Sequence, residues 1–172
     1  MRDFEAQLLK ETCNDVEVEP SLQPLGGEQI TGLVGNNAKP DVRARGFWRE
    51  GQNAYFDVRI TNTNSPSQCH LTTEKILAKH EKEKKRHYNN RIMNVEHGTF
   101  TPLVFTVNGG MSKECLTFHK FVAEKIANKT GCRYDKVLSF IKCKLSFLIL
   151  RASLMCVKRQ SLSSKALWES RN

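Results

Sequence analysis

The chain has 172 residues, 39% of them hydrophobic, which suits one domain of ordinary size with a buried core. Its formal charge of +9 favours a polyanionic partner, either a nucleic acid or an anionic surface, over a role in solubility alone. The six cysteines form no CxxC pair, and this argues against zinc fingers and dithiol redox sites.

The order of secondary-structure elements follows from hydrophobic spacing and turn residues. Residues 24–39 are rich in Gly, Asn and Pro and predict a loop. Arg49–Gly51 predicts the three-residue loop of a hairpin. The elements predicted in chain order are a helix at 3–13, strands at 15–22, 41–48 and 54–61, a highly charged helix at 74–95, a strand at 99–107, and helices at 112–128 and 135–159.

This order predicts an α/β fold with a mixed central sheet flanked by helices, because a hairpin pairs strands antiparallel and a helical crossover pairs them parallel. We expect a single domain over residues 1–159 and a polar, loose tail over 160–172. The N-terminus lacks the features of a secretory signal, and the most apolar tract, 145–157, is too short to span a bilayer. These features predict an intracellular protein, nuclear or cytoplasmic, without a membrane segment.

The last predicted helix carries an apolar stripe with spacings of three and four residues. Such a stripe either packs into the core or mediates a homodimer through helix 135–159, and the sequence leaves both readings open. Its members are Leu138, Ile141, Leu145, Leu148, Ala152 and Met155.

The predicted hairpin carries the candidate catalytic residues. Asp57 and Arg59 project from one face of their strand, because side chains alternate along a strand. If Trp48 pairs with Gln52, Asp41 becomes a diagonal neighbour of Asp57. Two converging carboxylates suit a hard divalent cation, Mg²⁺ or Mn²⁺, which can activate water and polarise a phosphodiester.

Pro40-Asp41 followed by Asp57-Val58-Arg59 resembles the PD-(D/E)XK signature of the restriction-endonuclease-like superfamily. The predicted order helix, three strands, helix, strand is similar to the αβββαβ core of that superfamily. Residues 41–48, 56–59 and 96–105 also resemble a domain found beside reverse transcriptases in mobile elements of invertebrate animals. This second resemblance covers most of the chain and is the more specific of the two.

The resemblance implies catalytic roles for Asp41 and Asp57 and places Arg59 where the superfamily has lysine. Arginine does not readily lose a proton, so Arg59 would serve only as an electrostatic clamp. Lys84, on the inward face of helix 74–95, can supply the missing ammonium group, or can extend past its neighbours to solvent. The superfamily often adds a carboxylate from its first helix. Asp3, Glu5 and Glu11 are available there, nothing in the sequence selects among them, and Glu5 is taken as the third metal ligand.

Basic residues on the hairpin and on helix 74–95 predict contacts with nucleic-acid phosphates, which position a nucleic acid without reading its sequence. These residues are Arg43, Arg45, Lys79, Lys82, Lys85 and Arg86. Most charge runs are only solvated helix faces, so each single residue carries that alternative reading.

Three functions remain in competition. The first is a metal-dependent DNA endonuclease domain of mobile-element origin. The second is a catalytically inactive module with the same fold that binds DNA or RNA. The third is a protein that interacts through the apolar stripe of its last helix.

Overall fold

The computed structural model describes residues 1–23 and 39–169, with residues 156–169 described as backbone only. Its elements are α1 (Arg2–Thr12), β1 (Val16–Val18), β2 (Val42–Arg45), β3 (Asn53–Thr61), α2 (Thr73–Asn94), β4 (Thr99–Thr106), α3 (Lys113–Thr130) and α4 (Tyr134–Glu169). This order and the α/β class confirm the sequence prediction. The predicted loop at 24–39 lies outside the described residues except for Lys39.

The four strands form one mixed sheet in the order β1-β2-β3-β4. The first three strands pair antiparallel, and β3 and β4 pair parallel. Parallel neighbours need a long crossover connection, and α2 supplies it. The predicted mixed sheet is therefore confirmed.

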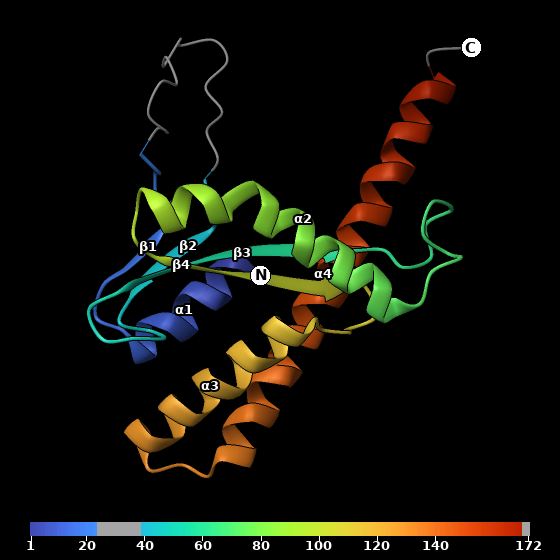
Figure 1. Ribbon diagram of the computed structural model, residues 1–172. Coiled ribbons are helices and arrows are strands. Elements are labelled where there is room, and N and C mark those ends of the chain that lie inside the picture. Colours follow the sequence, from blue (N-terminus) through green and yellow to red (C-terminus); the bar gives the residue numbers. More distant parts are fainter. Residues whose placement is uncertain (24–38, 170–172) are drawn as a thin grey trace.

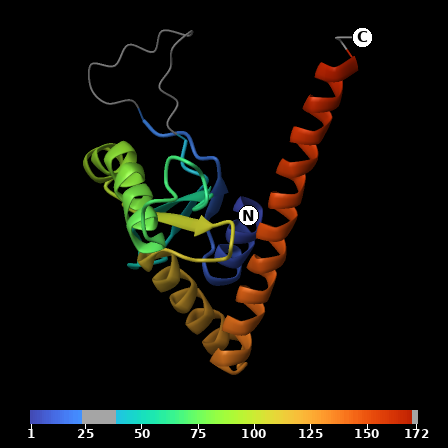
Figure 2. The same cartoon turned by 90° about the vertical axis from the view of Figure 1, so that its right-hand side faces the viewer.

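Helices cover both faces of the sheet. One face is covered by α2 and the other by α1 and α3, while α4 packs against α3 (Figures 1 and 2). The main core lies on the α1 and α3 side, where Phe56 of β3 meets Phe118 of α3 with ring centroids 4.9 Å apart. Because side chains alternate along β3, Asp57 points to the opposite face, toward α2.

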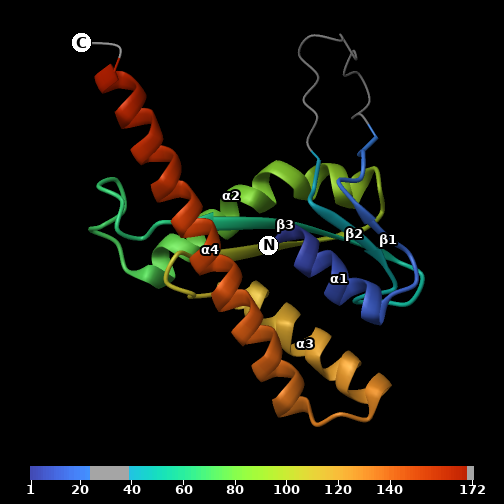
Figure 3. The ribbon, with the colours of Figure 1, turned by 180° about the vertical axis from the view of Figure 1, so that it is seen from behind.

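The helices α3 and α4 form a hairpin joined by a short turn (Figure 3). The side chain of Ser112 caps α3 by accepting a hydrogen bond from the Cys115 amide. At the other end Gly131 adopts a φ of 70°, a left-handed conformation that glycine adopts without strain.

The predicted end of the last helix at residue 159 is wrong, because α4 continues to Glu169 through the segment expected to be a loose tail. That segment is polar but contains neither glycine nor proline up to residue 169, so nothing in it breaks a helix. In the apolar stripe, Ile141 and Leu145 are fully buried, whereas Met155 is 55% exposed. Core packing is thus confirmed for the first half of the stripe. No helix in residues 1–23 and 39–169 is long and apolar enough to cross a membrane.

Candidate active site between β3 and α2

The register of the β2–β3 hairpin decides which side chains meet, and it differs from the predicted one. Arg43 pairs with Tyr55 and Arg45 with Asn53, whereas the predicted pairing of Trp48 with Gln52 would have placed Arg43 opposite Asp57, two residues further along β3. The strand ends at Arg45 because Gly46 turns the chain with a φ of 78° and Phe47 enters the aromatic core. A shift of two residues keeps every side chain on its predicted face.

The same shift brings Asp41 closer to Asp57 than predicted, since continuing the ladder by one residue places Asp41 directly opposite Asp57. Asp41 Oδ2 accepts a hydrogen bond of 2.7 Å from the Val58 amide, which fixes this carboxylate against β3. Burial raises the pKa of Asp41, and the nearby Asp57 carboxylate raises it further, against the opposing effect of the Val58 amide. The two acids therefore interact electrostatically at one place on the sheet.

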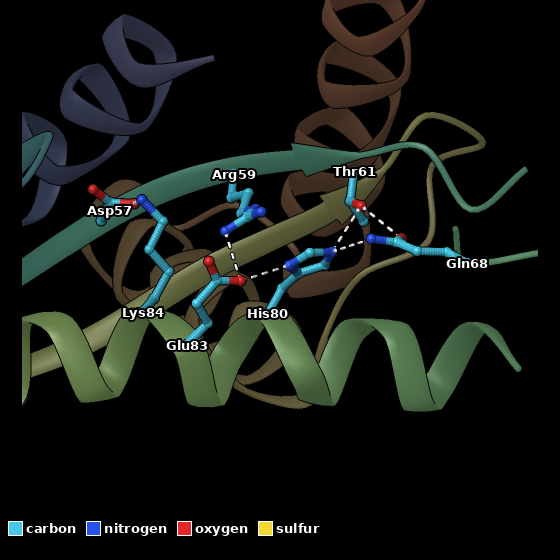
Figure 4. A network of polar contacts seen from close by, with 7 residues as sticks. All are labelled: Asp57, Arg59, Thr61, Gln68, His80, Glu83 and Lys84. Carbon is cyan, nitrogen blue, oxygen red and sulfur yellow. Dashed lines mark hydrogen bonds and ion pairs between the residues drawn. The ribbon is translucent and has the colours of Figure 1, made fainter. Parts of the chain in front are cut away.

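The side chain of Lys84 on α2 extends toward Asp57. Its Nζ atom lies 2.5 Å from Asp57 Oδ2, and the Asp57 residue is only 4% exposed (Figure 4). The inward face predicted for helix 74–95 is confirmed, because His80, Tyr88 and Ile92 on the same side are buried. The ammonium group therefore offsets the free-energy cost of burying the Asp57 carboxylate, while the Lys84 side chain as a whole remains 23% exposed.

Tyr88, one turn further along α2, encloses the site and was not among the predicted site residues. Lys84 Nζ lies 5.7 Å from the centre of its ring, and the Tyr88 hydroxyl donates a hydrogen bond to the Lys39 carbonyl. Burial raises the pKa of Tyr88, and the Asp57 carboxylate adds to this effect. The four-residue spacing of His80, Lys84 and Tyr88 was the sequence signal for its position.

Arg59 points to the same face as Asp57, as predicted, but its partner is Glu83 of α2, at 3.1 Å (Figure 4). Glu83 also accepts from His80 Nδ1 at 3.2 Å, which leaves the other ring nitrogen, Nε2, as an acceptor. That nitrogen lies 3.0 Å from Thr61 Oγ1 and 3.2 Å from Gln68 Nε2. Burial lowers the pKa of His80, which favours this neutral form. Arg59 is therefore held beside the acidic pair by a chain of hydrogen bonds.

A broad hollow of about 860 Å³ opens next to this chain of hydrogen bonds. Five cations line it, against the single acid Glu83: Arg59, Lys75, Lys79, Lys82 and Arg86. A smaller hollow of about 290 Å³ shares Arg59, Glu83 and Arg86 with it and is also lined by Lys84. The two hollows form a basic surface that extends as far as Lys84, the ion-pair partner of Asp57.

The other basic residues expected to contact phosphates are engaged elsewhere. Arg43 forms ion pairs with Asp15 and Glu17, both at 3.2 Å, and Lys85 pairs with Glu114. Arg45 donates a hydrogen bond to the Gly51 carbonyl at 3.3 Å. Of the six predicted residues, only Lys79, Lys82 and Arg86 line the hollow.

Glu5 does not join the acidic pair, which corrects the assignment of a third metal ligand. It is fully buried on the opposite side of the sheet, where both of its carboxylate oxygens lie 3.2 Å from His119 Nε2. Its helical position placed it on the inward side of α1, but that side faces α3.

The donor set of the site consists of two carboxylates, Asp41 and Asp57. In the described part of the chain, no three His, Cys, Asp or Glu side chains gather into a potential metal-binding group. Mg²⁺, however, is usually held in enzymes by one or two carboxylates and keeps several water ligands. Asp41 and Asp57 fit that requirement as a pair.

Comparison of the chain with models of known protein families and with curated proteins gave no match.

Proposed function

We propose that this chain is a metal-dependent endonuclease domain of the restriction-endonuclease-like type, of mobile-element origin, which hydrolyses phosphodiester bonds in DNA. The observation that carries the proposal is the convergence of two carboxylates and one ammonium group, Asp41, Asp57 and Lys84, on one face of the sheet. The element order α1 to β4 matches the αβββαβ core that the sequence resemblance implies.

In this proposal Asp41 and Asp57 hold Mg²⁺ or Mn²⁺. The ion would lower the pKa of a bound water and stabilise the leaving oxygen. Lys84 takes the place of the lysine that the signature has at position 59, and its ammonium group stabilises negative charge that develops on the phosphate. Arg59 acts as an electrostatic clamp, since its planar guanidinium group is suited to contact with a phosphate.

The basic surface supports a nucleic acid as the substrate. Its cations outnumber its acids five to one around the larger hollow, and the smaller hollow extends this charge to Lys84. A phosphate backbone bound along α2 would thus be brought to the acidic pair, and its binding would weaken steeply with salt.

Cleavage of supercoiled plasmid DNA tests the proposal. We expect nicking that requires Mg²⁺ or Mn²⁺ and falls at least about a hundredfold in Asp57→Asn and in Lys84→Met, because each removes charge from the reacting centre. Lys85→Met is the matched control, since the neighbouring Lys85 pairs with Glu114 instead. Circular dichroism establishes that each variant is folded.

A catalytically inactive nucleic-acid-binding module is the second candidate, and one observation favours it. Asp57 is already paired with Lys84, and Arg59 with Glu83, so the charges of these four side chains compensate one another without a metal ion. Salt-sensitive DNA or RNA binding without any metal-dependent nicking by the wild-type chain would select this candidate and overturn the first.

A further inference from the structure

Helix α4 carries a second apolar stripe that points away from the domain. The buried stripe contains Ile141, Leu145 and Ile149, and by helical geometry the second stripe lies about 180° from it. We call the second stripe the outer stripe; it consists of Phe140, Cys143, Phe147, Leu150 and Leu154. Its four large members are between 56% and 66% exposed, which is unusual for apolar side chains clustered on one surface.

The spacing of the outer stripe identifies the kind of partner that would cover it. Phe140, Phe147 and Leu154 recur every seven residues, and Cys143 and Leu150 each follow three residues after a member of that series. This is the a and d pattern of a coiled coil, with a mean period of 3.5 residues, whose partner is another α-helix. The stripe extends over about 20 Å of helix.

The surroundings leave room for such a helix. The helix α4 forms one edge of the molecule, with α3, α1 and the sheet all on one side of it (Figure 2). Phe140, Phe147 and Leu150 make no part of the main core, which takes in only the opposite side of α4. A partner helix can therefore lie along the outer stripe without displacing any described element.

Charges beside the outer stripe select the orientation of that helix. One flank carries the basic residues Lys144 and Arg151, and the other flank carries Ser139, Ser146 and Ser153. In a parallel pair each basic residue meets a serine of the other helix five residues earlier, for example Lys144 with Ser139 and Arg151 with Ser146. In an antiparallel pair basic residues would face one another and repel.

The serines can accept these contacts. Ser146 and Ser153 each donate their hydroxyl proton to a carbonyl of their own helix, at 3.0 Å. Their oxygen lone pairs therefore remain available to a lysine or arginine from another helix.

We propose that the outer stripe is the interface for a second copy of this chain, which binds parallel and in register about a twofold axis along α4. This arrangement is self-complementary, as a twofold interface requires, and it pairs neutral with basic flanks along its whole described length. It also places Cys143, an exposed free thiol at a d position, against Cys143 of the other copy. The inference is independent of the proposed nuclease activity.

Sedimentation equilibrium on the full chain tests the proposal. We expect a concentration-dependent species of twice the 19.7 kDa monomer mass. Phe147→Glu should raise the dimer dissociation constant at least about tenfold, since two buried phenylalanines are lost per dimer. Met155→Lys, on the same helix but off the outer stripe and 55% exposed, is the matched control and should leave the constant unchanged.

Disulfide cross-linking through Cys143 tests whether the two α4 helices of the dimer are parallel. In a chain with Cys69, Cys132 and Cys156 changed to serine, mild oxidation should give a covalent dimer that Cys143→Ser abolishes. A dimer that never cross-links through Cys143 would overturn the parallel arrangement. A chain that stays monomeric at all concentrations would overturn the proposal, and binding of that monomer to vesicles of phosphatidylserine and phosphatidylcholine would assign the outer stripe to a lipid surface instead.

Discussion

Two carboxylates are buried on opposite faces of the same sheet, each against a basic side chain from a helix, and they differ in access to solvent. Glu5 and His119 are both completely enclosed between α1 and α3. Asp57 is almost as buried, but its partner Lys84 is 23% exposed and borders an open hollow. The first pair can therefore contribute only to stability, whereas the second can exchange its partner for a ligand from solution.

Their surroundings differ as well. His119 lies within 5.0 Å of the Phe118 ring centre and 5.8 Å of the Phe105 ring centre, so the first pair is surrounded by aromatic side chains. Asp57 instead lies beside a second carboxylate, Asp41, and a tyrosine, Tyr88. A second acid next to a buried acid raises the cost of ionisation, and sites that bind ions often accept this cost.

Removing the enclosed carboxylate should give the largest loss of stability. Glu5→Ala leaves His119 buried without its partner, and breaking a buried pair in this way costs about 3–5 kcal/mol. Urea unfolding measures the loss. Glu11→Ala, an exposed acid on the same helix, is the control and should change the free energy of unfolding by less than about 0.5 kcal/mol. Equal effects of the two substitutions would mean that the Glu5–His119 contact contributes nothing.

Asp57→Asn should have a smaller effect on stability, of about 1–2 kcal/mol, because Lys84 can turn to solvent when it loses its partner. The same urea titration measures it, in buffer without divalent cations. A loss as large as that of Glu5→Ala would show that the site is as rigid and closed as the core, and would contradict the distinction between the two pairs.

The smallest expected effect is a pH dependence from His119. Burial alone lowers the pKa of His119, but the charge and hydrogen bonds of Glu5 outweigh burial and raise it above the ordinary value of 6.5. The folded state thus binds the proton more tightly than the unfolded state. The resulting stabilisation is complete below pH 6.5 and is lost as the pH rises through the raised pKa. Unfolding free energies measured across this range should fall with pH in the wild type and fall less in Glu5→Gln.

The sequence predicts correctly which face of a strand or helix each site residue occupies, but it does not predict the register of the β2–β3 hairpin. Alternation along β3 placed Asp57 and Arg59 together, and the three–four spacing along α2 placed Lys84 on the inward side. The two-residue error in the hairpin arose at Gly46 and Phe47, where a turn and the aromatic core together end β2 early. Strand propensity alone does not predict this early end of β2. The end depends on the packing of Phe47 against Phe118 and Phe121, which come from a helix distant in sequence.

The partners of single side chains were the least predictable part of the site. Arg43 is paired with Asp15, just before β1, and with Glu17 of β1, both far from it in sequence. Glu5 is paired with a histidine 114 positions away. Helical and strand periods indicate which way a side chain points but not which element it meets there. Lys84 was predictable because only one face of α2 is buried and it lies on that face.

The helix α2 carries Lys84 toward the sheet while Lys82 and Arg86 on the same helix line the larger hollow. Consecutive helical residues are 100° apart around the axis, so the three groups keep a fixed rotational phase. A single-residue insertion before Lys84 would turn its ammonium group away from Asp57, and another cation could not take its place without leaving the hollow. The number of α2 residues that precede Lys84 is therefore tied to the position of Asp57 on β3.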